Sequence, residues 1–292
     1  MALSKRIQAP GSLCYLKHDP IFEHEKPFFI RFPVDDYPEA KQTNLTFDFY
    51  DVTIEDIRGQ EDQFKFDVHG FELINFESQL KHEDFNDFRE NNDIYIKEIE
   101  AYFKNKMGFA FVEVYDLLIR RRTPQFPGAQ FQEKHIQPIR AVHVDSSRAE
   151  RVKQALASLT RAGIDPNKGR TQMFGSATHC IIRVWKPLNG PVRDWPLAVC
   201  DYRSCNADDI VDVDQVYPDA IGEGCNIYFN KNHKWFFVSN QMPHEALLLK
   251  QLDSRPDAAD YCAHAAFPWK EVDTVKEMRE SIEVRCVAWS PE

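Results

Sequence analysis

The chain has 292 residues, of which 43% are hydrophobic, and it carries a formal net charge of −10 at pH 7. This length suits one large β-rich domain or two ordinary ones, and the apolar fraction is enough for a substantial core. The acidic balance argues against a nucleic-acid surface and against an anionic membrane as partner.

Cysteine usage and the first residues indicate a reducing compartment. The seven cysteines are scattered, odd in number and without C-x-x-C spacing, so they suggest neither a disulfide framework nor a zinc ribbon. Met1 to Arg6 has no apolar signal-like region, and no run approaches the roughly 18 apolar residues of a membrane span. We therefore expect a soluble, cytoplasmic protein that acts on a small molecule, with no nucleic-acid or membrane partner. The oligomeric state stays open.

The N-terminal third mixes irregular, β and helical patterns. Prolines break any helix in residues 1–45, so we predict an extended N-terminal arm there. Alternating apolar residues from Leu45 to Phe49, and again at Phe64 and Phe66, predict a β-hairpin. Helical spacing from Ile94 to Phe103, followed by Gly108, predicts an amphipathic helix.

A strong strand pattern covers Phe109–Ile119, and the basic triplet that follows it, Arg120 to Arg122, is interpreted as a solvated strand end. Beyond residue 178 the pattern is almost wholly β, with short apolar runs separated by turns. Such spacing is typical of a sandwich or jelly roll. We predict a mainly β fold with flanking helices. Its core is expected to be a double-stranded β-helix (jelly-roll, cupin-like), in one domain over residues 46–292.

The candidate site starts in the run Arg140–Ser147, which carries His143 and Asp145. Successive side chains of a strand alternate between faces, so these two point to the same side while Val142 and Val144 pack on the other. An imidazole beside a carboxylate suits iron(II) if a second histidine completes the ligand face and leaves open positions. Directly afterwards, Ser147 to Glu150 has the form of a capping box, which predicts a helix ending near Gly163.

The completing ligand must come from among the other histidines of the ten in the chain. His264 is favoured because it lies among small residues that leave room at a metal. It is also followed by Arg279 and Ser281 at the entrance of the last strong strand. His233 and His244, which lie in or beside predicted strands, remain the alternatives.

With these residues the chain resembles the Fe(II)/2-oxoglutarate-dependent oxygenases, which carry H-x-D, a distal histidine and R-x-S on a jelly roll. It is similar in particular to the fungal aspergillic-acid-cluster-type hydroxylase/desaturase family, related to gibberellin desaturase and cephem methoxylase components. Two positions depart from that family's pattern: Ala263 replaces a common proline, and Lys186 replaces an arginine. The stretches that carry the closer likeness are Arg183–Leu188, Pro196–Asp201, Asp253-Ser254 and Arg279–Arg285.

The resemblance implies that His143, Asp145 and His264 bind Fe(II), leaving positions for chelating 2-oxoglutarate and for dioxygen. Arg279 would pair with the far carboxylate of this cosubstrate and Ser281 would add a hydroxyl donor. Arg285 is interpreted instead as a structural ion pair with Glu283. The implied activity is hydroxylation, desaturation or oxidative cyclisation of a small secondary metabolite, centred on the iron, with no separate acid or base assigned.

Four more residues are candidates for a substrate or cosubstrate pocket, namely Arg183, Trp185, Tyr202 and Trp235. A buried arginine at position 183 needs a carboxylate partner or a substrate anion, whereas aromatic residues at strand spacing are more often core than pocket. Two other functions stay compatible with the sequence. One is an iron oxidase of the same fold that uses no 2-oxo acid, and the other is an inert jelly-roll binding module.

Overall fold

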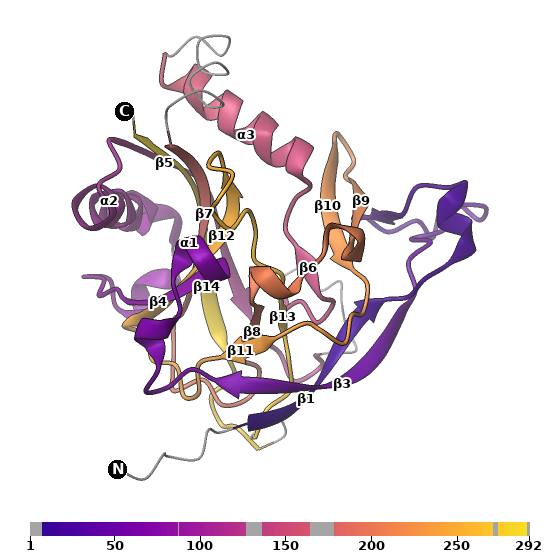
Figure 1. Cartoon of the computed structure of the whole chain (residues 1–292), viewed down its shortest axis with the longest axis horizontal. Helices are drawn as coiled ribbons and strands as arrows, with labels where there is room; N and C mark the ends of the chain where they lie inside the picture. Colours follow the sequence, from indigo (N-terminus) through magenta and orange to yellow (C-terminus); the bar gives the residue numbers. More distant parts are fainter. Residues whose placement is uncertain (1–7, 87, 127–135, 164–177, 271–273, 291–292) are drawn as a thin grey trace.

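The computed structural model describes residues 8–86, 88–126, 136–163, 178–270 and 274–290. Within these residues two β-sheets face one another (Figure 1). The larger sheet pairs its strands in the order β1-β3-β11-β8-β13-β6-β10-β9-β2. Their bounds are β1 (Gln8–Leu16), β2 (Phe28–Ile30), β3 (Phe47–Asp56), β6 (His143–Val144), β8 (Leu197–Cys200), β9 (Ile210–Val216), β10 (Ile221–Ile227), β11 (Trp235–Phe237) and β13 (His264–Ala266).

The smaller sheet is antiparallel throughout its described strands and has the order β4-β12-β7-β14-β5. From β5 to β8, and again from β11 to β14, the chain passes from one sheet to the other at every strand. This alternation is that of a double-stranded β-helix, so the predicted jelly-roll fold is confirmed. The bounds are β4 (Phe71–Asn75), β5 (Phe111–Arg121), β7 (Thr178–Pro187), β12 (Glu245–Asp253) and β14 (Glu280–Ser290).

Strand β14 shows how side-chain alternation divides the molecule into an outer core and an inner site. Ile282 and Val284 point outward into an apolar cluster shared with helix α2. Ser281 and Glu283, one residue out of phase, point to the other face, toward the larger sheet. Polar residues are seldom buried without a partner, so those on the inner face of β14 indicate a functional site there.

Two helices cover the sheets (Figure 1). Helix α2 packs on the outer face of the smaller sheet, and Gly108 follows it with a φ of 75°, a left-handed conformation that glycine adopts without strain. Helix α3 begins after Ser147, whose hydroxyl accepts from the Glu150 amide at 3.1 Å, and packs on inner-facing residues at one end of the smaller sheet. The helices are α1 (Phe66–His69), α2 (Phe88–Met107) and α3 (Arg148–Arg161), with short 3-10 turns at Pro20–Glu23, Glu61–Gln63, His82–Phe85, Tyr202–Ser204 and Ala207–Asp209.

The hairpin predicted from Leu45–Phe49 and from Phe64 and Phe66 is wrong. Strand β3 does form, but Phe66 begins the single turn of α1, which ends at Gly70 with a φ of 84°. A side chain at position 70 would meet the Tyr261 carbonyl oxygen at 2.5 Å, so this close approach requires glycine. The chain is thereby redirected, and β4 joins the smaller sheet instead of pairing with β3.

The described part of the N-terminal segment adds strands to the larger sheet. Strand β1 pairs antiparallel with β3 along its whole length, and β2 pairs parallel with β9. The division of the chain at residue 45 stays a prediction. No helix within the described residues is long and apolar enough to cross a membrane.

Candidate metal centre

Strands β6 and β13 bring the candidate ligands together. The two strands lie side by side in the larger sheet, with His264 directly opposite His143 in the register. Asp145 follows β6 and lies two residues beyond His143, so alternation places its side chain on the same face. Asp145 and His264, which are 119 positions apart in the sequence, are therefore brought close together by the pairing of β6 with β13.

The donor atoms of these three residues form one compact group. One nitrogen or oxygen from each of His143, Asp145 and His264 lies within 4.8 Å of the others. The Asp145 Oδ1 atom is 3.7 Å from His143 Nε2 and 3.8 Å from His264 Nε2, and the two imidazole centroids are 4.3 Å apart. Such a group of two imidazoles and one carboxylate is the ligand set of non-haem iron(II) sites.

Backbone carbonyls fix which imidazole nitrogens face the centre. His143 Nδ1 is 2.8 Å from the Ala141 carbonyl oxygen, and His264 Nδ1 is 2.9 Å from that of Cys262. A carbonyl oxygen can only accept, so both Nδ1 atoms carry the proton and both Nε2 atoms present a lone pair. Burial lowers the pKa of His143 to about 3 and also lowers that of His264, which keeps both rings neutral and able to ligate.

The unsatisfied atoms fit a divalent cation. His143 Nε2 and Asp145 Oδ2 are buried and have no hydrogen-bond partner among the described residues. Buried polar atoms in proteins are nearly always satisfied, and an ion is one accepted reason for an exception. Two neutral imidazoles and a carboxylate whose donor atoms lie within 4.8 Å of one another are the kind of donors that iron(II) takes.

Arg183 of β7 lies directly against this group. Its guanidinium is 2.5 Å from Asp145 Oδ1 through Nη2 and 2.9 Å from His264 Nε2 through Nη1, and the residue is 1% exposed. Burial alone would raise the pKa of Asp145, but the charge of Arg183 and smaller electrostatic contributions from its other neighbours, including Arg285, together outweigh burial and hold that pKa at about 2. The carboxylate is therefore ionised at every physiological pH.

A second carboxylate supports Arg183 from behind. Glu283 of β14 is 3.2 Å from Arg183 Nη2 and 2.5 Å from Arg120 Nε, and all three residues are buried. Arg120 also donates to the Gln137 carbonyl oxygen at 2.9 Å. The interpretation of the basic triplet as solvated is therefore wrong for Arg120, and for Arg122, whose side chain is 7% exposed and lies 3.1 Å from Asp194.

The predicted cosubstrate anchor lies at the start of β14, with Arg279 immediately before the strand and Ser281 within it. Arg279 and Ser281 are buried, and neither Arg279 Nε nor Ser281 Oγ has a hydrogen-bond partner among the described residues. The Arg279 guanidinium lies 5.1 Å from the ring centroid of Trp185, whose indole N–H is also buried and unpartnered. Its Nη1 donates to the Trp195 carbonyl oxygen at 2.6 Å. Three orphaned donors in one buried region suit an anionic ligand.

Arg285 differs from Arg279 because its charge already has a protein partner. Its Nη1 is 2.7 Å from Asp116 Oδ2 on β5. The ion pair expected for Arg285 thus exists, but with Asp116, whereas Glu283 pairs with Arg120 and Arg183. Register explains this, because Arg285 lies opposite Asp116 across β14 and β5.

The chain is similar to known proteins over most of its length. A family model described as "Oxidoreductase/YMDC permease-like domain" matches residues 13–289. The alpha-ketoglutarate-dependent dioxygenase tstK of Talaromyces stipitatus is 31% identical, over 81% of this chain and 83% of its own. The hydroxylase/desaturase efuI of Hormonema carpetanum is 30% identical, over 85% and 86%. The solved structure of the iron and alpha-ketoglutarate-dependent endoperoxidase NvfI superposes with a TM-score of 0.82 and 25% identity, over 99% of this chain and 100% of that one.

The chain belongs to this family of iron(II)- and 2-oxoglutarate-dependent oxygenases. The family, the oxidoreductase class and the iron and 2-oxoglutarate expected from the sequence are therefore confirmed. Among the described residues, His143, Asp145 and His264 form a group that could hold a metal ion.

Two aromatic candidates do not converge on the metal group of this oxygenase. Trp235 lies in the apolar cluster that contains Val142, on the face of the larger sheet opposite His143, and its indole donates to Tyr15 at 2.8 Å. Tyr202 packs edge-on against Tyr261, with centroids 4.9 Å apart, against that same cluster. The geometry gives no support to either as a pocket residue.

The sequence did not predict that Arg120 is buried behind the candidate metal centre, nor that Glu283 pairs with both Arg120 and Arg183. The available signal was the alternation of β14, which places Glu283 on the same face as Ser281. What the sequence did not provide was the register that sets β5 and β7 on either side of β14.

We expect Glu283→Gln to destabilise the oxygenase by about 3–5 kcal/mol, because it leaves the buried charges of Arg120 and Arg183 without their shared partner. Chemical denaturation measures this loss. Glu280→Gln is the matched control on the same strand, since Glu280 pairs with the partly exposed Arg121 and should cost less than about 1 kcal/mol. Equal losses in the two variants would contradict the role given to Glu283.

Proposed function

We propose that this oxygenase hydroxylates, desaturates or oxidatively cyclises a small secondary metabolite, with His143, Asp145 and His264 as the iron ligands. The observation that carries the ligand assignment is the convergence of their donor atoms within 4.8 Å, with His143 Nε2 and Asp145 Oδ2 unsatisfied. The relatives named hydroxylase/desaturase and dioxygenase support the reaction class. Iron(II) bound there would supply the oxidising chemistry, together with 2-oxoglutarate and dioxygen.

The protein residues around the ligands orient them and balance their charge. The Ala141 and Cys262 carbonyls hold the imidazole rings, and such outer contacts set ligand orientation in metal sites. The positive charge of Arg183 balances the negative charge of the Asp145 carboxylate. The lone pair of His264 Nε2 cannot serve both Arg183 and a metal, so in the proposed site Arg183 would keep its two carboxylate partners, Asp145 and Glu283.

The proposed cosubstrate site lies toward the start of β14. Arg279 would bind the far carboxylate of 2-oxoglutarate, with Ser281 and the Trp185 indole as neutral donors. Six residues of strand separate Arg279 from Arg285, about 20 Å at about 3.3 Å per residue, so only one of the two can reach this anion. Arg285 already pairs with Asp116, which favours Arg279.

Anaerobic mixing of the protein with iron(II) and 2-oxoglutarate should produce the weak visible charge-transfer band of a bound chelate, and admitting oxygen should release succinate. Band and succinate together support the proposal. An iron oxidase that uses no 2-oxo acid would consume oxygen without either, and an inert binding module would retain no iron. Candidate secondary metabolites should then be incubated with the loaded enzyme, and mass spectrometry should show whether an oxidised product forms together with succinate.

A further inference from the structure

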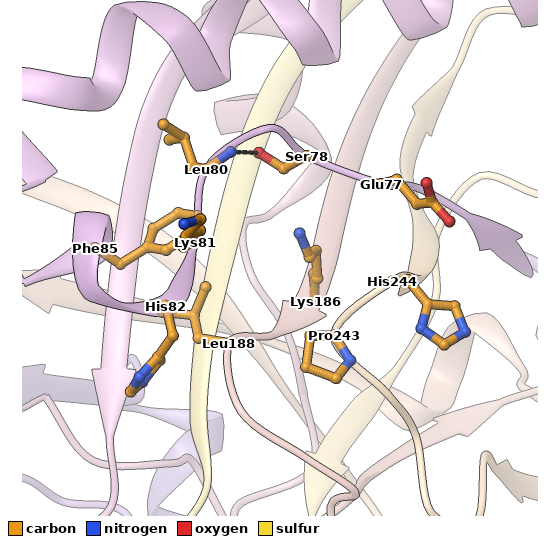
Figure 2. A pocket seen from close by; sticks show the side chains of 10 residues that line it. All are labelled: Glu77, Ser78, Leu80, Lys81, His82, Phe85, Lys186, Leu188, Pro243 and His244. Atoms are coloured by element: carbon orange, nitrogen blue, oxygen red, sulfur yellow. Dashed lines mark hydrogen bonds between the residues drawn. The ribbon is translucent and has the colours of Figure 1, made fainter.

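A second pocket lies on the opposite side of the smaller sheet from the metal centre. It has a volume of about 430 Å³ and is formed by the segment after β4, the end of β7 and the loop before β12 (Figure 2). Lys186 of β7 points into it, whereas its neighbour Trp185 points to the inner face near Arg279. The pocket is therefore separate from the proposed iron and cosubstrate sites.

Lys186 is a buried ammonium group without a counterion. The residue is 4% exposed, and no carboxylate of the described residues lies within ion-pair distance of it. The rings of Phe76 and Tyr95 lie 5.5 and 5.6 Å from Nζ, a cation–π contact that does not use its N–H donors. Burial lowers the pKa of Lys186 to about 8, and the charge of Glu98 offsets only part of that effect.

Glu98 is the acid whose charge acts on Lys186, but its carboxylate oxygens already accept hydrogen bonds from other residues. Glu98 of α2 accepts from the Ser78 hydroxyl at 2.5 Å and from the Gln79 amide at 2.9 Å, so it braces the pocket rim rather than Lys186. Glu77 lines the exposed mouth of the pocket. The mouth also carries Lys81, His82 and His244, so cationic or titratable nitrogens outnumber carboxylates among the lining residues.

The rest of the lining is apolar. Leu80, Phe85, Leu188 and Pro243 form the walls, and Figure 2 shows Lys186 projecting between these residues and His244. An anion with an apolar body matches both features, because its charge would satisfy the ammonium while its body would be buried against these side chains.

We propose that this pocket binds the carboxylate of a small organic acid, with Lys186 Nζ as the charged donor and Leu80, Phe85 and Leu188 against its apolar body. A carboxylate beside Lys186 makes a charge-assisted contact shielded from water, which is stronger than the same contact on the surface. The site is independent of the iron chemistry.

Benzoate is the probe, titrated by calorimetry into the iron-loaded protein without oxygen and with saturating 2-oxoglutarate, so that the cosubstrate site is filled. The wild type should bind it saturably and more tightly than acetate, which lacks the apolar body. Lys186→Met should weaken binding at least about tenfold, and Lys81→Met at the mouth by less than about threefold. Equal benzoate binding by the wild type and Lys186→Met would overturn the proposal, as would inorganic phosphate binding as tightly as benzoate.

A second measurement does not depend on any variant. In crystals of the wild type soaked with benzoate, the carboxylate should lie within hydrogen-bond distance of Lys186 Nζ. Benzoate located only beside Arg279 would place it in the cosubstrate site and refute the second pocket. Neither readout uses turnover, so failure here is distinct from failure of the proposed function.

Discussion

His264→Ala should bind iron(II) more than about 100-fold more weakly than the wild type and should lose succinate release. Loss of an outer contact to a metal ligand already costs about 10- to 100-fold in affinity, and loss of the ligand itself must cost more. Equilibrium dialysis of iron(II) without oxygen measures the affinity. Circular dichroism should show a folded protein, because the variant removes one side chain from a strand whose neighbours Ala265 and Ala266 keep their packing.

The two histidines left open by the sequence are the controls. His233, just before β11, is held by Tyr15 at 3.1 Å and Asp209 at 3.2 Å, and His244 is exposed at the mouth of the second pocket. Neither belongs to the metal group, so His244→Ala and His233→Ala should keep iron affinity within about threefold. Full iron occupancy and activity in His264→Ala would reject its assignment as a ligand.

Local patterns of the sequence contained much of this site. The alternation in the β-branched run around His143 is enough to place Asp145 on the same face, because a strand has a period of two. The small residues around His264 likewise reflect a tightly packed strand position. The prediction for Asp145 depended on side-chain direction along a single strand, whereas the choice of His264 depended on its small neighbours and on Arg279 and Ser281, which follow it in the chain.

The charge network behind the site could not be predicted in the same way. Arg120, Arg183 and Glu283 lie on β5, β7 and β14, which are far apart in the chain and are brought together by strand register alone. Register over such separations depends on the packing of the whole sheet, so a basic triplet at a strand end was interpreted as solvated when part of it is buried. The hairpin prediction failed for a related reason. The close approach of Gly70 to Tyr261 is a contact between segments that are distant in the sequence.

The second large effect is expected at the cosubstrate anchor, where Arg279→Met should raise the 2-oxoglutarate KM steeply. A charge-assisted contact in a buried site is worth roughly 2–4 kcal/mol, or about 30- to 800-fold. Methionine keeps much of the side-chain volume against Trp185, so the change is mainly one of charge and hydrogen bonding. Initial rates of succinate release at varied 2-oxoglutarate give the KM, and iron affinity should stay within about threefold.

Arg285→Met is the matched control, because Arg285 shares the strand face of Arg279 yet already pairs with Asp116 at 2.7 Å. Its loss should move the 2-oxoglutarate KM by less than about threefold. The guanidinium of Arg279, in contrast, has a buried Nε without a partner and lies near the unpartnered hydroxyl of Ser281, so an incoming carboxylate satisfies donors that the protein leaves open. If Arg285→Met lost cosubstrate affinity while Arg279→Met retained it, the anchor would be Arg285 in the middle of β14, and the assignment of Arg279 would be wrong.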